Sequence, residues 1–205
     1  MTSDLWLAAW EQEKSRSVSS SPLPEASWKA GGRASKKYPD KENEEWWHEH
    51  GPNMVQAWID WRQNGWTIWE APNGHPAIEL ALNPSFGDVP IKMVLDRVFV
   101  TPNGELVVVD LKTGRTEPTA LQLAWYAAGM DVIFGVRPKF GAYWMARDGL
   151  TTPLVDLDLW PTDMIVDLTA QFDKARKAGI FLPNHSACKM CSVKTECKWY
   201  KGEQQ

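Results

Sequence analysis

Residues 107–114 read VVVDLKTG, and this stretch decides how the rest of the chain is interpreted. Three valines predict a buried β-strand, and Thr113-Gly114 predicts its end. Because side chains alternate between the two faces of a strand, Asp110 and Lys112 share one face. An isolated acid and lysine at this spacing usually form an ordinary solvated pair, so the neighbouring residues have to decide between that interpretation and a catalytic one.

A predicted hairpin brings a second acid towards Asp110. The segment TPNGE (101–105) contains Asn103-Gly104, a strong turn signal, between two predicted strands over residues 90–100 and 105–112. With the turn centred on residues 102–103, paired residue numbers sum to about 205, so Asp96 falls within one residue of the position opposite Asp110. A register shift or bulge of one residue, which is common beside active sites, aligns the two carboxylates.

Two neighbouring carboxylates repel each other unless a cation lies between them. Hard oxygen ligands suit Mg²⁺ or Mn²⁺, and Asp96 and Asp110 are the expected ligands. The backbone carbonyl of Leu111 and the carboxylate of Glu79, on the preceding strand, are further candidate ligands. Lys112 would orient a water molecule, lower its pKa, or neutralise charge on a phosphorane.

The helix predicted over residues 118–135 carries a polar pair. Gln122 and Tyr126 are four residues apart and therefore lie on one face, which can lean over the end of the Lys112 strand. The other predicted elements are helices over 4–14, 43–64 (its continuity at Gly51-Pro52 left open) and 162–179, and strands over 66–71, 76–83 and 139–147, with a long loop over 15–42. This order predicts an α/β core with an antiparallel hairpin at its centre.

Composition restricts the class of protein. The 205 residues suit one domain with a small appendage, and no apolar run is long enough to span a membrane. No secretory signal is evident, so a soluble, cytoplasmic protein is expected. The net charge of −4 does not indicate nucleic-acid binding, although six basic residues lie between Lys14 and Lys37, both included. Thirteen tryptophans predict aromatic packing, with stacking on exposed bases as the alternative.

Three cysteines cluster near the end of the chain as Cys188-x2-Cys191-x5-Cys197. An odd, clustered set in an intracellular chain favours a metal site over disulfides. His185 extends the pattern to His-x2-Cys-x2-Cys-x5-Cys and is equally consistent with a fourth ligand, to iron–sulfur or Zn²⁺, and with a solvent-exposed loop histidine.

These motifs together resemble the RecB-like branch of the PD-(D/E)XK nuclease superfamily, and within it the CRISPR-associated exonucleases of the Cas-four type and their phage relatives. The segments VLDRVFV, GELVVVDLKTG and LQLAWYA carry the resemblance. It implies a restriction-endonuclease-like core, α-β-β-β-α-β with a mixed sheet flanked by helices, and a C-terminal Cys-bearing tail. It also implies catalytic roles for Asp96, Asp110, Lys112, Gln122 and Tyr126, with Gln122 and Tyr126 positioning the phosphate or DNA backbone, and a [4Fe–4S] cluster on the cysteines.

The chain departs from the family pattern at three places. Met93 stands where the family has a glycine three residues before the acid. No histidine follows Gly51 on the first core helix, although His48 and His50 precede it. The N-terminal cysteine that completes the cluster in the family is absent, and His185, a three-cysteine cluster or a metal-free tail are the alternatives.

The predicted organisation is an N-terminal helix and basic loop over 1–45, a nuclease core over 46–180, and a cysteine tail over 181–205 packed on the core. The predicted function is that of a metal-dependent DNA exonuclease or end-processing nuclease, acting on single-stranded or duplex ends in phage or CRISPR-related recombination or processing. A non-catalytic DNA-end-binding protein with a degenerate site is the alternative, and a restriction-type endonuclease the third. A homo-oligomer or a recombination or CRISPR partner protein is left open.

Overall fold

The protein is described here from a computed structural model, which places residues 2–20, 44–114, 118–180, 184, 188, 191–197 and 199–200. Residues 21–42 of the loop predicted over residues 15–42, and the candidate ligand His185, lie outside these described residues. All other candidate site residues lie within them.

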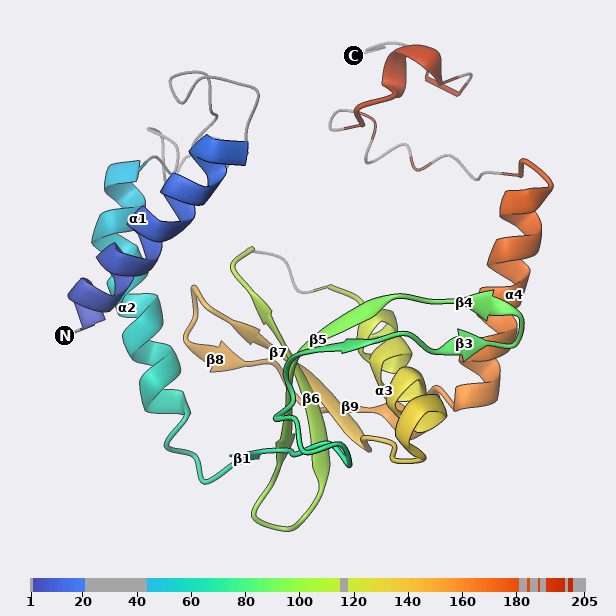
Figure 1. The fold of residues 1–205 in the computed structure, drawn as a ribbon, viewed down its shortest axis with the longest axis horizontal. Coiled ribbons are helices and arrows are strands. Elements are labelled where there is room, and N and C mark those ends of the chain that lie inside the picture. The colour runs from blue at the N-terminus through green and yellow to red at the C-terminus, as the bar shows by residue number, and fades with distance from the viewer. Residues whose placement is uncertain are drawn as a thin grey trace.

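A seven-stranded mixed sheet forms the centre of the molecule (Figure 1). Its main path runs β1-β5-β6-β7-β8, with β2 paired to β5 and β9 paired to β7. The strands are β1 (Thr67–Ile68), β2 (Ile78–Leu82), β5 (Met93–Val100), β6 (Leu106–Lys112), β7 (Phe140–Met145), β8 (Leu150–Thr151) and β9 (Val155–Asp156), and a separate hairpin consists of β3 (Ser85–Phe86) and β4 (Val89–Pro90). β5 and β6 are antiparallel and β6 and β7 are parallel, so the predicted central hairpin and the mixed sheet are confirmed.

The described residues form four α-helices: α2, with α1 packed against it, lies on one side of the sheet, and α3 and α4 lie on the other (Figure 1). They are α1 (Thr2–Ser20), α2 (Glu44–Trp61), α3 (Leu121–Phe134) and α4 (Thr162–Lys177), with short 3-10 helices at Leu157–Leu159 and Lys194–Glu196. α3 is the crossover between the parallel strands β6 and β7. The α/β class predicted from the sequence is confirmed, and α1 continues six residues beyond its predicted end at residue 14.

Each face of the sheet has its own apolar core. Residues from β5, β6 and β7 pack beneath α3 in one cluster, which includes Val98, Val108 and Tyr143. The alternate residues of the same strands, Phe99, Val107 and Val109 among them, pack beneath α2 in the other. Asp110 lies two residues after Val108 on β6, so its side chain points to the same face of the sheet, the one that α3 covers.

The tryptophans of α2 and of the segment that follows it pack against the sheet. The Trp58 and Trp61 rings stack at 5.1 Å, and both lie against Phe99. Trp66 and Trp144 complete this cluster. The packing interpretation of the sequence is confirmed for these four residues.

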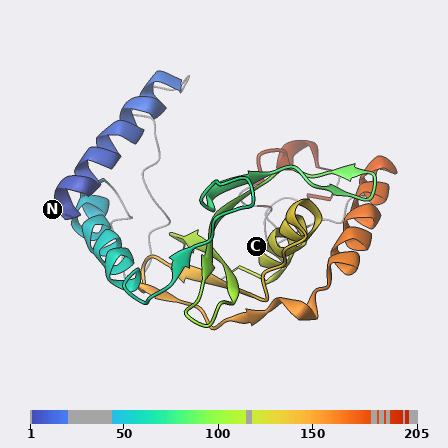
Figure 2. The same ribbon diagram turned by 60° about the horizontal axis from the view of Figure 1, so that its bottom comes forward.

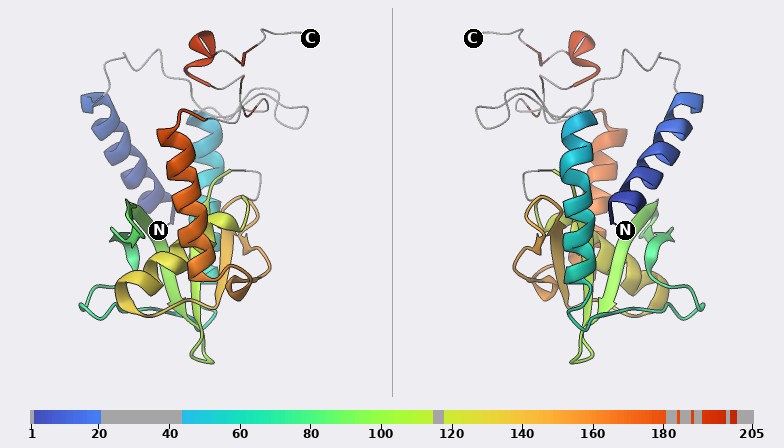
Figure 3. Two further views of the ribbon diagram at one scale, coloured as in Figure 1. Left: turned by 90° about the vertical axis from the view of Figure 1, so that its right-hand side faces the viewer. Right: turned by 90° about the vertical axis from the view of Figure 1, so that its left-hand side faces the viewer.

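α2 runs without interruption through Gly51-Pro52, where the sequence left a break open. Gly51 is buried because Trp6 of α1 lies against it, and a Cβ there would be 2.4 Å from the Trp6 ring. The stacked Trp6 and Trp47 rings join the same two helices. α1 therefore packs along α2, as the views from two further sides also show (Figures 2 and 3). No helix in the described part of the chain is long and apolar enough to cross a membrane.

Candidate functional site

The site lies where β5 separates from β6. The last residue pair between these strands is Arg97 with Val109, so residue numbers sum to 206, one more than the sequence arithmetic predicted. The next positions in this register are Asp96 and Asp110, which therefore lie opposite each other. β6 continues beyond that point by pairing with β7 as far as Lys112 and Met145. The two acids stand at the fork between the separating strands.

Asp96 takes over the hydrogen bonding of the backbone where the ladder between β5 and β6 ends. The amide N–H of Leu111 donates to Asp96 Oδ2 over 2.8 Å. This bond fixes the carboxylate of Asp96 against the strand that carries Asp110 and Lys112.

Asp110 is the buried acid of the site, with 2% of its surface exposed. Its Oδ1 accepts a hydrogen bond from Gln122 Nε2 at 2.9 Å and a longer one from the Tyr126 hydroxyl at 3.4 Å. Its Oδ2 forms an ion pair with Lys112 Nζ at 2.5 Å. Burial raises the pKa of Asp110 above its ordinary value, contact with Lys112 opposes this, and the charge of Asp96 adds to it.

Gln122 and Tyr126 connect α3 to the two ends of this ion pair. Gln122 Oε1 accepts from Lys112 Nζ over 3.2 Å, while its amide nitrogen donates to the Tyr126 hydroxyl over 2.7 Å as well as to Asp110. Burial raises the pKa of Tyr126. The sequence placed this pair on one face and expected it to position the phosphate or the DNA backbone. In the structure its described contacts run to Asp110 and Lys112, so it also orients the carboxylate and the ammonium, and the phosphate role stays a prediction.

Strand β7 supplies supports that the sequence reasoning missed. Tyr143 is paired with Asp110 in the parallel register, and its ring lies 5.6 Å from Lys112 Nζ. Its hydroxyl donates to the Thr119 carbonyl, just before α3, over 2.8 Å. Period-two alternation places Tyr143 on the same face as Asp110, but its contact with the start of α3 joins residues 24 apart and has no local signature.

Arg147, just after β7, anchors the chain that follows Lys112. Its Nε donates to the Thr113 carbonyl over 2.7 Å, and its guanidinium lies over the rings of Trp46 and Trp47 of α2. The described contacts of these two tryptophans therefore include the arginine that fixes the end of β6.

Three other candidate residues make their described contacts away from the Asp96–Asp110 pair. Glu79 forms an ion pair with Arg97 at 3.0 Å, with 64% of its side chain exposed. His48 lies 3.5 Å from Glu44, and the ring of His50 stacks on that of Trp46. The described contacts therefore bring neither histidine nor Glu79 together with Asp110.

Met93 stands where the resembled family has a glycine, and Gly129 on α3 makes room for its side chain. It is buried in β5, and a Cβ on Gly129 of α3 would lie 2.4 Å from its sulfur. The larger side chain on the strand is therefore matched by the smallest residue on the helix above it.

The donor set fits one divalent cation. Asp96 and Asp110 present hard oxygen atoms, and the one described partner of buried Oδ2 of Asp110 is the Lys112 ammonium. Within the described residues, no three His, Cys, Asp or Glu side chains gather at one place. A cation there would therefore take two carboxylates from the chain and its remaining ligands from a backbone carbonyl such as that of Leu111, from substrate or from water.

The described residues of the cysteine tail do not come together as a metal site. Cys188, Cys191 and Cys197 are all free thiols of intermediate exposure, and Cys188 Sγ contacts the Asn184 carbonyl at 3.8 Å. The described thiols form no metal-binding group, so the structure lends no support to a [4Fe–4S] or Zn²⁺ site.

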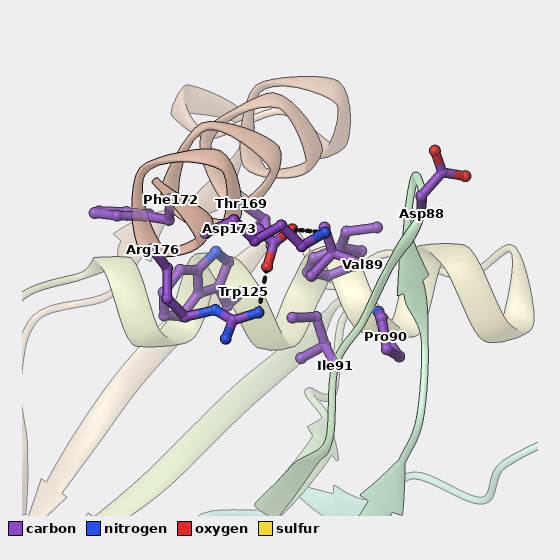
Figure 4. Close-up of a pocket in the computed structure, with 11 residues that line it drawn as sticks. Asp88, Val89, Pro90, Ile91, Trp125, Thr169, Phe172, Asp173 and Arg176 are labelled. Carbon is purple, nitrogen blue, oxygen red and sulfur yellow. Dashed lines mark hydrogen bonds and ion pairs between the residues drawn. The ribbon is translucent and has the colours of Figure 1, made fainter. Parts of the chain in front are cut away.

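A cavity of about 590 Å³ lies on another flank of α3, between Trp125 of that helix, the β3–β4 hairpin and α4 (Figure 4). Apolar side chains such as Phe86, Ile91 and Phe172 line much of it, and Asp173 pairs with Arg176 on its α4 side. None of the five predicted catalytic residues lines this cavity, so it is separate from the acid pair.

Comparison with known proteins agrees with this geometry. The family model described as the PD-(D/E)XK nuclease superfamily matches residues 6–198. The chain is 31% identical over 182 residues to the Gene 69 protein of Mycobacterium phage D29, covering 78% of this chain and 67% of that protein. It is 29% identical over 201 residues to the Gene 69 protein of Mycobacterium phage L5, covering 78% of this chain and 69% of that one. With its mixed sheet flanked by helices and a family match over nearly its whole length, the chain belongs to the PD-(D/E)XK nuclease superfamily.

Proposed function

We propose that the protein is a metal-dependent DNA exonuclease or end-processing nuclease that hydrolyses phosphodiester bonds. The observation that carries this proposal is the buried carboxylate of Asp110, held between Lys112 and Gln122 and lying opposite Asp96. A buried ion pair is costly to keep, because both partners lose their hydration. A site that only bound DNA would gain nothing from an ammonium placed against a buried acid.

Asp96, Asp110 and the carbonyl of Leu111 are the residues proposed to hold the cation, and nucleases of this superfamily generally use Mg²⁺ or Mn²⁺. When bound, such a cation stabilises negative charge on the scissile phosphate and makes a water molecule more acidic. Glu79, the fourth ligand predicted from the sequence, makes its described carboxylate contact with Arg97 and is not needed as a ligand in this proposal.

The other side chains prepare the site for this chemistry. The Lys112 ammonium stands beside the carboxylate, where it can hold the attacking water or neutralise charge on the phosphate. Gln122 and Tyr126 fix the orientation of Asp110 through its Oδ1. These groups recognise phosphate and sugar rather than base edges, so cutting should depend little on sequence.

The relatives come from two mycobacteriophages, which supports a phage setting, and the role proposed there is DNA recombination or processing. CRISPR-related processing is the other setting that the family resemblance implies. The expected substrates are single-stranded or duplex DNA ends. The proposed assembly is a homo-oligomer or a complex with a recombination or CRISPR partner protein.

The test uses linear duplex, single-stranded and circular DNA with Mn²⁺, comparing wild type with Lys112→Ala. We expect the wild type to shorten linear DNA and leave closed circles intact, and the variant to bind ends without cutting. Cutting of circles would indicate an endonuclease. A wild type that binds ends and cuts nothing in Mn²⁺ or Mg²⁺ would support the non-catalytic alternative and overturn this proposal.

A metal on Cys188, Cys191 and Cys197 remains a separate prediction, and no step above depends on it. Metal analysis of protein purified without oxygen tests it. A brown protein with several iron atoms per chain would support [4Fe–4S], and a colourless protein with one zinc would support Zn²⁺. A metal-free tail would contradict both.

A further inference from the structure

Glu79 has a backbone conformation that is unusual for its residue type. Its φ is +50°, and of the described residues it is the one non-glycine with a positive φ. In this left-handed region the Cβ of an L-residue crowds the following carbonyl, so residues other than glycine, asparagine and aspartate rarely adopt it. Strained backbone of this kind persists where the surrounding structure requires it.

The strained residue lies directly across from a candidate metal ligand. In the pairing of β2 with β5, Ile78 faces Arg97 and Leu80 faces Leu95. Glu79 therefore stands opposite Asp96, between these two pairs.

Both strands change face at this position. Ala77 and Leu80 both belong to the core beneath α3, although residues three apart on a regular strand point to opposite faces. Leu95 and Val98 on β5 show the same change. The left-handed residue Glu79 on β2 thus lies opposite Asp96, where the side chains of β5 change the face of the sheet to which they alternate.

This switch accompanies the separation of β5 from β6. The ladder between them ends at the pair of Arg97 and Val109, and Asp96 then directs its carboxylate to the amide of Leu111. The Glu79 side chain takes no described part in that contact, since its carboxylate pairs with Arg97 and is largely exposed. The backbone of Glu79, rather than its charge, is what adjoins the site.

We propose that Glu79 is a positioning residue whose left-handed backbone, and not its carboxylate, sets the place of Asp96 and thereby the affinity of the site for a divalent cation. This inference deepens the proposed function and rests on it for its consequences in cutting. It replaces a direct ligand role for Glu79 with an indirect one through the path of β2 and β5.

Three substitutions separate the backbone role from the ligand role. Glu79→Gly and Glu79→Gln both remove the charge, but glycine adopts positive φ freely and glutamine matches glutamate in shape. Glu79→Val removes the charge and also disfavours the left-handed region, because of its branched Cβ. Ala81→Val, on an exposed position of the same strand, is the control for adding valine to β2.

Two measurements report on each variant. Mn²⁺ affinity is measured by isothermal titration calorimetry, and protection of the Leu111 amide from hydrogen exchange is measured in EDTA. The second reports the bond to Asp96 without any metal or activity. We expect Glu79→Gly, Glu79→Gln and the Ala81→Val control to keep the Mn²⁺ affinity within about threefold of wild type. Glu79→Val should weaken the Mn²⁺ affinity by about tenfold or more and should lose the exchange protection of the Leu111 amide.

Intact exchange protection of Val107 and Ala142, in the paired stretch of β6 and β7 away from β2, shows that a variant has folded. If Glu79→Val does not fold, Glu79→Ala takes its place, with a smaller weakening expected relative to Glu79→Gly. Equal loss of Mn²⁺ affinity in Gln, Gly and Val would indicate a ligand carboxylate and overturn the inference. Unchanged Leu111 protection in folded Val or Ala variants would also overturn it. A wild type that neither binds Mn²⁺ nor cuts DNA would refute the proposed function, while Leu111 protection would still decide the role of Glu79.

Discussion

Lys112 and Asp110 form an ion pair where β5 separates from β6, with Nζ of the lysine 2.5 Å from Oδ2 of the acid. Asp110 is almost fully buried, so the ammonium offsets part of the cost of removing this carboxylate from water. The same oxygen belongs to the pair of carboxylates that fits a divalent cation. A cation bound as proposed would therefore compete with the lysine for one buried oxygen atom.

Replacing Lys112 by methionine should separate metal binding from cutting. Without the competing ammonium, we expect Mn²⁺ to bind at least about tenfold more tightly, because repulsion between two close cations is removed. DNA cutting should be lost. Calorimetry and a cleavage assay measure the two effects. Lys139→Met, which removes a half-exposed lysine paired with Glu105, is the control. Weaker Mn²⁺ binding in Lys112→Met would contradict the competition.

The buried acid also makes a prediction about stability and pH. Because the folded pKa of Asp110 is raised, its contribution to stability is fully present below its unfolded pKa and is lost as the pH rises through the folded value. In EDTA, Asp110→Asn should therefore unfold at higher denaturant than wild type at pH 7, and the difference should shrink as the pH is lowered. Adding Mn²⁺ should stabilise wild type only. A variant less stable than wild type at neutral pH would count against the pKa direction.

Tyr143→Phe tests the link between β7 and α3. The substitution keeps the ring beneath Lys112 but removes the hydrogen bond to the Thr119 carbonyl. We expect the free energy of unfolding to fall by about 1 kcal/mol. The cutting rate should fall while the affinity for DNA stays the same, since Gln122 loses the fixed start of its helix. An unchanged rate would show that the hydroxyl serves stability alone.

Met93 and Gly129 should behave as a coupled pair. Gly129→Ala alone should destabilise the fold by about 1–3 kcal/mol, because its Cβ meets the Met93 sulfur. Met93→Ala alone should also destabilise it, by about 2–5 kcal/mol, by leaving a cavity. In the double variant the clash disappears, so the combined loss should be smaller than the sum of the two. Urea unfolding of the four proteins measures the coupling, and simple additivity would refute it.

Much of the site follows from local patterns in the sequence. The turn at Asn103-Gly104 fixed the pairing of β5 and β6 to within one residue, and alternation placed Asp110 and Lys112 on one face. The (i, i+4) spacing brought Gln122 and Tyr126 together. These features depend on neighbours close in sequence, where strand and helix periods apply.

The supports of the site were not predictable in the same way. Tyr143 and Arg147 act through contacts with residues 24 and 34 positions away, which depend on the packing of whole elements. The left-handed residue Glu79 has no signal in its type, since glutamate is not a residue of positive φ. The β3–β4 hairpin was not predicted, although Gly87-Asp88 is a turn dipeptide that signals it.

Tyr143 and Arg147 have a consequence for how this protein can vary. Thr113 and Thr119, near either end of the connection from β6 to α3, are tied by their carbonyls to Arg147, just after β7, and to Tyr143 of β7. The spacing between Lys112 and Gln122 is therefore supported by β7 and the turn after it, and depends less on the length of chain that joins them. This connection is the natural place for an insertion, whether acquired in evolution or introduced as a reporter, that leaves the chemistry of the fork undisturbed.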